Sequence, residues 1–525
     1  MEERYTDIRL VKVPIEIDNK NQLTFSSTNT QYNYFDSLEH IELDDSSYQR
    51  KDNTIRYPGH IDDLIGYNYC MYKNTGYSNK WFYAFITDMR YMNDEMTLIT
   101  IKTDVWQTWQ FDLEIKQCFV EREHVDNDAI GLHTIPEGLE TGAYKVYSHL
   151  SDSYNNQLRF ITLSTVGPSD LEKYSLSLYN GIPTPGVYCK WSMDSAGLTG
   201  LASFINSLNS NGKIDAMNCM FLAPEWLAPT NGTVYVTTSS TVPSVSLGIS
   251  RISTLDGYIP KNKKLLCYPY CYIGVSNGIG QYNIYKQERW SLDSNNEMKL
   301  TMRGVLTPGG SIRAFPENYN GDGIGTDESI TVGKFPQLAW SNDLYTNWQT
   351  QNGVNLGGIR LNATEYGIAR SVLQMGLGGA MLASGNIIGT QMLGGGIGEA
   401  FNAVQENYQH SLAPNAIEGS VNSGDVTTML GMNRLHAYRM GITSEYAQVI
   451  DSFFSSYGYK VNKVKVPNIT GRTNWNYVKT IDCNIHGYIP QKDCIEIKNM
   501  FNAGVTFWHN PSTFLDYSQT NNIVS

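Results

Sequence analysis

Residues 371–398 read SVLQMGLGGAMLASGNIIGTQMLGGGIG and contain no charged side chain. Across the whole chain 17% of residues are charged, so an uncharged run of this length constrains what the chain can fold into. Nine of its residues are glycine. The apolar side chains between the glycines are soft and flexible, and they are Met375, Leu377, Met381, Leu382, Ile387, Ile388, Met392, Leu393 and Ile397.

Three common structures fit this stretch poorly. Each interior glycine destabilises a helix by about 1 kcal/mol relative to alanine, so a buried helix that is stable in water is not expected. The length suffices for a membrane span of about 20 residues, but polar side chains dilute the hydrophobicity. These side chains are Ser371, Gln374, Ser384, Asn386, Thr390 and Gln391. Disordered segments favour charge and low hydrophobicity, which is the reverse of this composition.

Two hypotheses remain for the stretch. The first is a conditional membrane-insertion loop, hidden from water in one state and placed in lipid in another. Small residues four apart, such as Gly385 with Gly389, would let helices pack closely in a bilayer. The second is a glycine-rich loop that only fills space in an assembly.

The charge balance argues against a protein that grips nucleic acid. The chain has 51 acidic and 39 basic residues and a net charge of −12, whereas tight binding to DNA or RNA needs clustered Lys and Arg. An acidic surface would repel phosphate and let a polynucleotide slide past. The 35 tyrosines favour extended strands and half-wet interfaces, so we expect a β-rich protein that assembles with copies of itself.

The eight cysteines are scattered along the chain and do not form the dense spacing of a disulfide scaffold. Cys267 and Cys271 have no matching Cys or His pair nearby, so a zinc site is not expected there. We expect free buried thiols and synthesis in a reducing cytosol. Residues 1–20 carry alternating charges and no apolar core, so we expect no signal peptide.

Local patterns predict several elements. Residues 81–119 are rich in β-branched and aromatic side chains with a break at Asn93-Asp94, which predicts a hairpin with long arms. Residues 25–35 read as a turn-rich polar stretch. We expect helices at about 169–181, 200–208, 363–373, 399–410, 444–457 and 491–503, with Gly458 and Gly504 ending the last two.

These elements predict a mainly β protein of the α+β class, divided into five parts. The parts are an N-terminal β domain at 1–149, an inserted α+β subdomain at 150–262, a second β domain at 263–352, the glycine-rich loop at 353–432 and a C-terminal α+β segment at 433–525.

A search for chemistry finds no P-loop, zinc-protease, nucleophile-elbow or dinucleotide motif. Glu121, Glu123 and His124 resemble a catalytic cluster, but on a regular strand the two glutamates share one face and the histidine takes the other, so we expect a solvated strand face. The loop Asn318–Ser329 partly matches a calcium-binding pattern but ends in serine where glutamate is needed. We therefore expect no enzyme activity, no cofactor and no metal.

Several motifs carry a resemblance to a known family. They are NKWFYAFITDMRYMNDEMTLITIKTDVWQTWQFDL, FVEREHV, YPYCY, MRGVL, SFFSSYGYKVNKVKVPN, NYVKTIDCNI and GVTFWH. Together they resemble the tail knob (distal tail tube) proteins of small short-tailed bacteriophages with protein-primed genomes. The resemblance extends over about residues 25–510, and the inserted region at about 150–262 matches poorly.

This resemblance implies a homohexameric ring of tail-tube-like β domains at the distal end of the phage tail. It implies that a long hydrophobic loop, here about 353–432, plugs the tube and inserts into the host membrane during genome ejection, opening a pore for DNA. The implied partners are other copies of the chain, other phage tail proteins, the host cell membrane and double-stranded DNA in transit. The alternatives are a structural tube or adaptor without membrane activity, and a tail-associated cell-wall hydrolase.

Overall fold

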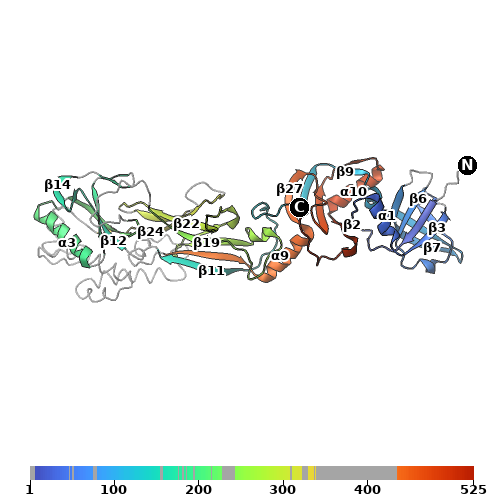
Figure 1. Cartoon of the computed structure of the whole chain (residues 1–525), viewed down its shortest axis with the longest axis horizontal. Coiled ribbons are helices and arrows are strands. Elements are labelled where there is room, and N and C mark those ends of the chain that lie inside the picture. The colour runs from blue at the N-terminus through green and yellow to red at the C-terminus, as the bar shows by residue number, and fades with distance from the viewer. Residues whose placement is uncertain are drawn as a thin grey trace. The chain divides into compact units, whose positions relative to one another are not determined.

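The fold is given by a computed structural model (Figure 1). It describes residues 6–46, 48–49, 53–74, 80–153, 158–174, 177–179, 182–184, 186–192, 195–213, 216–227, 243–278, 280–307, 310–321, 329–335, 337–338 and 434–524. These residues form two compact units. The first contains residues up to 142, residues 257–265 and residues from 444 onward, and the rest belong to the second.

The first unit begins with a seven-stranded antiparallel sheet in the order β3-β1-β6-β7-β8-β5-β4. The strands are β1 (Thr6–Val11), β3 (His40–Ser46), β4 (Tyr48–Gln49), β5 (Thr54–Tyr57), β6 (Tyr69–Asn74), β7 (Trp81–Asn93) and β8 (Met96–Thr103). Asn93 pairs with Met96 at the end of the β7–β8 hairpin, so the hairpin predicted around Asn93-Asp94 is confirmed.

Both faces of this sheet are buried. Successive residues of β6 point to opposite faces, and Tyr69 and Met71 join one hydrophobic cluster while Cys70 and Tyr72 join another. The second cluster draws side chains from six of the seven strands, which requires the sheet to curve around it. The sequence of β6 is therefore apolar at consecutive positions instead of alternating.

Helix α1 (Thr28–Asp36) covers the first of these clusters. Its Phe35 is fully buried and stacks on Tyr69 with 5.4 Å between ring centroids. The expectation of a polar turn at 25–35 was wrong because Ser27 and Thr30 form a capping box that starts a helix. Thr28, Asn29, Thr30 and Asn33 are exposed. Gln31 is buried and donates a hydrogen bond to the Gln107 carbonyl.

A five-stranded sheet completes the first unit, in the order β2-β30-β28-β10-β27, with only the β2–β30 pair parallel among its described strands. Its strands are β2 (Asn21–Leu23), β10 (Cys118–Glu123), β27 (Tyr459–Lys465), β28 (Trp475–Ile481) and β30 (Val505–Trp508). Beside it lie β9 (Leu113–Ile115), β29 (Ile485–Gly487), α2 (Val105–Trp109), α9 (Ser444–Tyr457) and α10 (Gln491–Ala503). Helices α2 and α10 share a core with β28 and β30.

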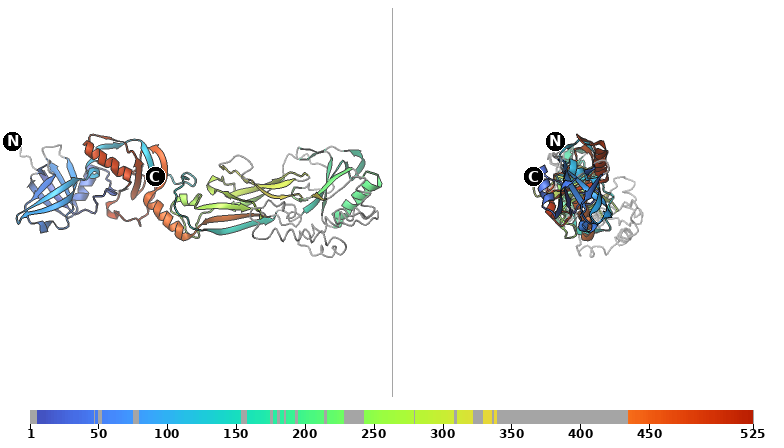
Figure 2. Two further views of the ribbon diagram at one scale, coloured as in Figure 1. Left: turned by 180° about the vertical axis from the view of Figure 1, so that it is seen from behind. Right: turned by 90° about the vertical axis from the view of Figure 1, so that its right-hand side faces the viewer.

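The second unit contains three four-stranded sheets, ordered β11-β26-β20-β21, β17-β12-β18-β25 and β19-β22-β23-β24, with the hairpins β13-β14 and β15-β16. The strands are β11 (Tyr144–Ser153), β12 (Leu158–Ser164), β13 (Val166–Gly167), β14 (Asp170–Tyr174), β15 (Ser177–Tyr179), β16 (Ile182–Thr184), β17 (Val187–Ser192), β18 (Met217–Pro224), β19 (Ser244–Ser250), β20 (Cys271–Ser276), β21 (Tyr282–Tyr285), β22 (Glu297–Gly304), β23 (Ser311–Glu317), β24 (Ile330–Lys334), β25 (Gln337–Leu338) and β26 (Arg434–Ile442). Helix α3 (Ser195–Ser210) is the green helix of Figure 2. It packs on β17, where Phe204 stacks on Trp191. Short 3-10 helices cover Ile61–Leu64, Lys263–Leu266, Gln287–Arg289 and Pro511–Thr513.

The mainly β fold class is confirmed, as are α9, α10 and the helix near 200–208, which corresponds to α3. The helix expected at 169–181 is wrong. Gly167 pairs with Asp170 across Pro168-Ser169, so the proline sits in a tight turn between β13 and β14 instead of at the start of a helix. The helices expected at 363–373 and 399–410 lie outside the described residues, and the five-part domain division stays a prediction.

Replacing Gly458 should destabilise the first unit. Gly458 has φ +63° after α9, and a Cβ there would overlap the backbone carbonyl of Glu123. Gly257→Ala is the matched control, because Gly257 also has positive φ, +87°, but a Cβ there meets nothing within 4 Å. The left-handed backbone should cost each variant about 1–2 kcal/mol. Gly458→Ala should lose more, and equal losses in urea unfolding would contradict the steric account.

Candidate functional site

The predicted membrane-inserting side chains, Met375 to Ile397, all lie within 339–433, outside the described residues. The loop proposed to resemble a calcium site also falls partly outside, at 322–328. The described residues include the two strands that flank the glycine-rich segment, β25 and β26, and the first unit, which contains no residue of the segment.

The strand before the segment lies at the edge of a sheet. β25 pairs only with β18 among the described strands, Leu338 with Met220 and Gln337 with Phe221. Phe335, just before β25, is 2% exposed and stacks on Phe221. A buried aromatic and two paired residues thus hold the chain as it enters the segment.

The strand after the segment lies inside a different sheet. β26 pairs with β11 on one side and β20 on the other, and its Leu435 and Ala437 are fully buried. On the opposite face, the rings of His149 and Tyr438 stack at 4.7 Å, and His149 Nε2 lies 2.9 Å from His436 Nδ1. The described pairing partners of both flanking strands therefore lie outside 339–433.

In the first unit, two buried carboxylates join three separate stretches of chain. Glu137 has a fully buried side chain and forms ion pairs with Arg122 and Lys264. Its Oε1 also accepts a hydrogen bond of 2.9 Å from the backbone N–H of Lys460. Glu137 therefore binds β10, residues 257–265 and β27 at once.

Asp451 of α9 is the second buried carboxylate and is 1% exposed. It accepts hydrogen bonds from the Tyr258 hydroxyl at 2.7 Å, the Lys261 N–H at 2.7 Å and the Asn262 N–H at 3.0 Å. This set attaches residues 257–265 to α9. Charge-assisted hydrogen bonds of this kind are about twice as strong as neutral ones.

The solvated strand face predicted for Glu121, Glu123 and His124 is wrong. Val120 and Arg122 pair with the consecutive β28 residues Thr480 and Lys479, so Glu121 is the extra residue of a β-bulge relative to β28. The bulge returns Glu123 to the buried face, where it is 1% exposed.

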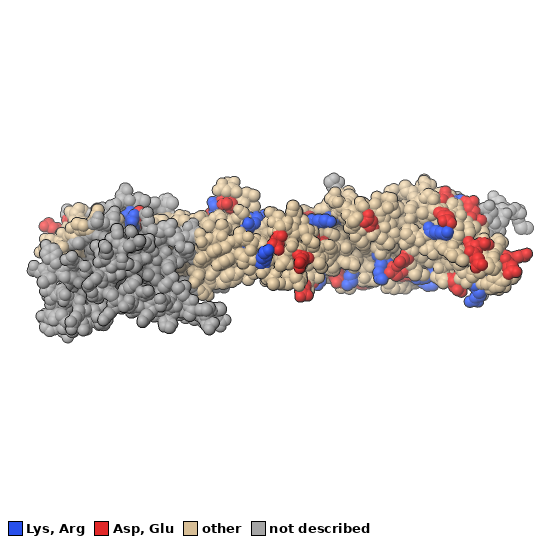
Figure 3. Space-filling view, turned by 90° about the horizontal axis from the view of Figure 1, so that it is seen from below, with Lys and Arg blue, Asp and Glu red and all other residues tan. Residues whose placement is uncertain are grey.

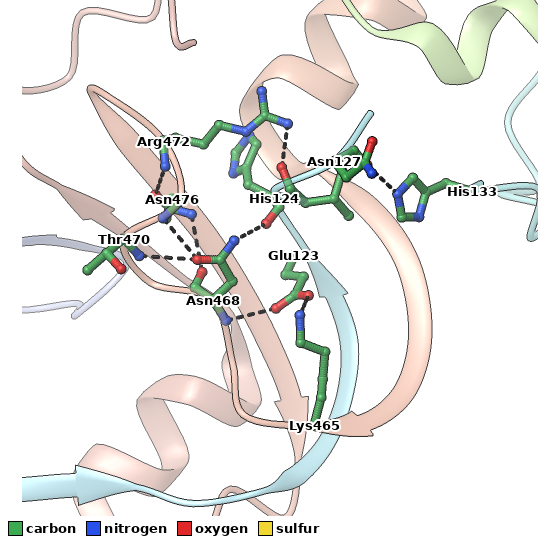
Figure 4. A network of polar contacts seen from close by, with 11 residues as sticks. Glu123, His124, Asn127, His133, Lys465, Asn468, Thr470, Arg472 and Asn476 are labelled. Atoms are coloured by element: carbon green, nitrogen blue, oxygen red, sulfur yellow. Dashed lines mark hydrogen bonds and ion pairs between the residues drawn. The ribbon is translucent and has the colours of Figure 1, made fainter. Parts of the chain in front are cut away.

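Both buried groups are fully occupied by structural contacts (Figure 4). Glu123 accepts from Lys465 Nζ at 2.5 Å and from the Asn468 N–H at 2.9 Å. His124 Nδ1 accepts from the Tyr477 N–H at 2.7 Å, and its Nε2 lies 3.1 Å from the Ser455 carbonyl. Burial lowers the pKa of His124 to about 3, so the ring is neutral and has no free nitrogen for acid–base chemistry.

Sequence reasoning missed the roles of Glu137 and Asp451. One signal was present, because Asp451 lies among the apolar positions Ala447, Ile450 and Phe454 that α9 buries. An acid on the buried face of a helix needs partners. No comparable signal marks Glu137, whose partners come from distant parts of the sequence.

Other features bear on ligands. Within the described ranges, no group of three or more His, Cys, Asp or Glu side chains could hold a metal ion. No described helix has the length and apolar character needed to cross a membrane. On the face drawn in Figure 3, acidic and basic side chains of the described residues are interspersed, without a continuous basic patch.

An exposed apolar row crosses one face of the five-stranded sheet. Phe119 lies directly opposite Val464 on one side and Ile481 on the other, so the three side chains share a face. Their exposed fractions are 37%, 67% and 55%. The row lies next to the edge of the sheet, since β27 is its last strand.

Comparison with known proteins identifies the family. The family model described as Bacillus phage phi29, tail knob protein gp9, C-terminal domain, matches residues 236–522, more than half of the chain. The chain belongs to the phi29 tail knob family. A second model, the caudoviral major tail protein N-terminus, matches residues 4–114, which include the seven-stranded sheet.

Individual tail knob proteins agree with this assignment. The chain is 27% identical to tail knob protein gp9 of Bacillus phage PZA and 26% identical to that of Bacillus phage phi29, with 96% of each chain covered in both comparisons. The solved tail knob protein gp12 of bacteriophage C1 matches the fold with a TM-score of 0.59 at 16% identity, over 99% of this chain and 100% of that one. The resemblance seen in the sequence motifs is confirmed, and this tail knob protein is a structural component of a phage virion that assembles with other tail components.

Removing the charge of Glu137 should destabilise the first unit strongly. Glu137→Gln leaves Arg122 and Lys264 without their buried partner, and breaking a buried ion pair typically costs about 3–5 kcal/mol. Glu114→Gln is the control, because Glu114 pairs with Lys116 at the surface and such pairs contribute about 1 kcal/mol or less. Urea unfolding of both variants measures the difference, and a loss below about 1 kcal/mol for Glu137→Gln would contradict the role.

Proposed function

We propose that this tail knob protein forms a homohexameric ring at the distal end of the phage tail, that the ring conducts double-stranded DNA, and that its glycine-rich loop at 353–432 inserts into the host membrane for genome ejection. The observation that carries the proposal is the uncharged run 371–398 in an otherwise polar, acidic chain. We infer no enzyme activity and no cofactor.

The mechanism follows from the solvent preferences of the loop. In the ring, six copies of the loop pack against one another and shield their apolar side chains from water. Once released, they are driven into the bilayer by the hydrophobic effect, at about 25 cal/mol per Å² of apolar surface removed from water. The missing charge matters because one charged side chain at the bilayer centre costs at least about 2.5 kcal/mol.

The flanking strands suit a segment that leaves its place. β25 and β26 keep all their described pairing partners outside 339–433, so movement of the loop need not unpair either sheet. The described pairing of both strands can therefore persist when the loop moves. This supports separate roles for the loop and for the body of the protein.

The charge distribution supports passage of DNA without specific binding. The net charge is −12, and a polynucleotide is retained by counterion release to clustered Lys and Arg. Interspersed charges of the kind seen in Figure 3 do not provide such clusters on that face. A conduit of this composition lets its cargo move.

Release of dye from vesicles tests the membrane step. The purified protein, or a peptide of residues 365–405, should release dye, and Gly389→Asp or Ile388→Asp should reduce release by about tenfold or more because of the added charge. Gly389→Ala is the matched control, since it removes the same glycine without adding charge. Phage carrying the Asp variants should assemble normally but fail to deliver DNA.

The outcomes separate the candidate functions. Wild-type protein that releases no dye at any pH or lipid composition would favour a structural tube or adaptor in which the loop is only a plug. Normal infectivity of the Asp variants would refute membrane insertion by this loop. Clearing of bacterial cell walls in a zymogram would instead favour the cell-wall hydrolase.

Light scattering tests the ring. The assembled wild-type protein should have six times the mass of one chain. We assign the row of Phe119, Val464 and Ile481 to contact between copies, so Val464→Asp should reduce assembly without lowering the melting temperature. Val524→Asp is the control, at an exposed valine, 52%, whose backbone N–H donates to the Gly471 carbonyl outside the row. Equal assembly of both variants would remove the row from the interface.

A further inference from the structure

Two cysteines from distant parts of the sequence meet in the first unit. Cys118 is the first residue of β10, and Cys483 lies two residues beyond the end of β28. The strands pair antiparallel, with Phe119 opposite Ile481. Asp482 has φ +55°, so the backbone turns sharply between Ile481 and Cys483.

The two thiols lie within hydrogen-bonding reach of each other. The register of Phe119 with Ile481 brings the chain at 118 beside the chain at 482–483. Their exposed fractions are 6% and 1%. Both are free thiols in this structure, and no metal-binding cluster of the described residues includes them. Thiols within hydrogen-bonding reach across two neighbouring strands are close to the separation that a disulfide needs.

We propose that Cys118 and Cys483 form a disulfide site that is reduced while the chain folds in the host cytoplasm and is oxidised in the virion outside the cell. A small-molecule disulfide is a sufficient oxidant. One protein thiolate attacks it and releases one small thiol, and the second protein thiolate then attacks the mixed disulfide and releases the other. The protein loses two electrons and two protons, and the small disulfide gains them.

The position of the two cysteines in the sequence determines how much a disulfide would stabilise the first unit. β10 and β28 are adjacent in the five-stranded sheet, yet they are separated in sequence by the whole second unit. A bond between 118 and 483 closes a loop that contains most of the chain. In the chain-entropy account, closing a long loop restricts the unfolded state more than closing a short one. The oxidised first unit should therefore melt at a higher temperature.

Burial makes the reaction slow. It raises the pKa of both thiols, that of Cys483 to about 12. The thiolate is the reacting form, so little of it is present at neutral pH and the rate should increase as the pH rises. Slow oxidation is compatible with folding and assembly in the reduced state before the particle leaves the cell.

A gel assay on the purified full chain tests the site. After incubation with oxidised glutathione at alkaline pH, the denatured protein should lose two of its eight alkylatable thiols and migrate faster without reductant, and dithiothreitol should reverse both changes. Cys118→Ser and Cys483→Ser should each abolish the shift. Cys70→Ser, at a buried cysteine elsewhere in the unit, should retain it.

Two further measurements make the test decisive. Cys267 and Cys271 could also pair, but their short loop would not change migration, so the shift distinguishes the two sites. Mass spectrometry of digested wild-type protein should find one linked peptide pair containing 118 and 483, which needs no variant to fold. Eight alkylatable thiols after oxidation, or a shift that persists in Cys118→Ser, would overturn the proposal.

Discussion

The first unit is held together by two buried carboxylates, those of Glu137 and Asp451, and by the groups that pair with them. Glu137 and Asp451 each bind groups from distant stretches, so the unit can close only when residues up to 142, 257–265 and the C-terminal part meet. A buried carboxylate without partners is strongly unfavourable. Burial of an unpaired carboxylate would therefore destabilise a chain in which these stretches are wrongly assembled. This favours the native arrangement of a unit that the chain leaves and re-enters twice.

Elements with local signals could be predicted from the sequence. Helices α9 and α10 have apolar spacing and a glycine at the end, and the β7–β8 hairpin has β-branched arms around a turn. Where a local signal was ambiguous, the prediction failed. Pro168 fits both the first turn of a helix and a β-turn, and pairing of Gly167 with Asp170 decided between them. The polar composition of α1 gave no sign of a helix, although Ser27 and Thr30 form a capping box. The helix is stabilised by packing of Phe35 on the sheet, which the local sequence does not reveal.

The candidate sites also differ in whether a local sequence signal marks them. The glycine-rich loop is visible in the sequence because its distinguishing property is composition, which requires no partner to be recognised. The surroundings of Glu123 and His124 could not be predicted, since one bulge residue, Glu121, reverses the faces that alternation assigns. A shift of one residue moves every later side chain of a strand to the opposite face. Composition survives such shifts, whereas a side-chain constellation does not.

Under the proposed function, the protein conducts DNA and also moves a loop from water into lipid, and these two tasks must not disturb each other. Charge is the property that separates them here. The described part of the chain has buried ion pairs such as Lys264 with Glu137, and on the face drawn in Figure 3 its acidic and basic side chains are interspersed. The run 371–398 omits charge entirely, which is what transfer to lipid requires. Because every described pairing partner of β25 and β26 lies outside the uncharged run, this described pairing can persist when the run changes its surroundings.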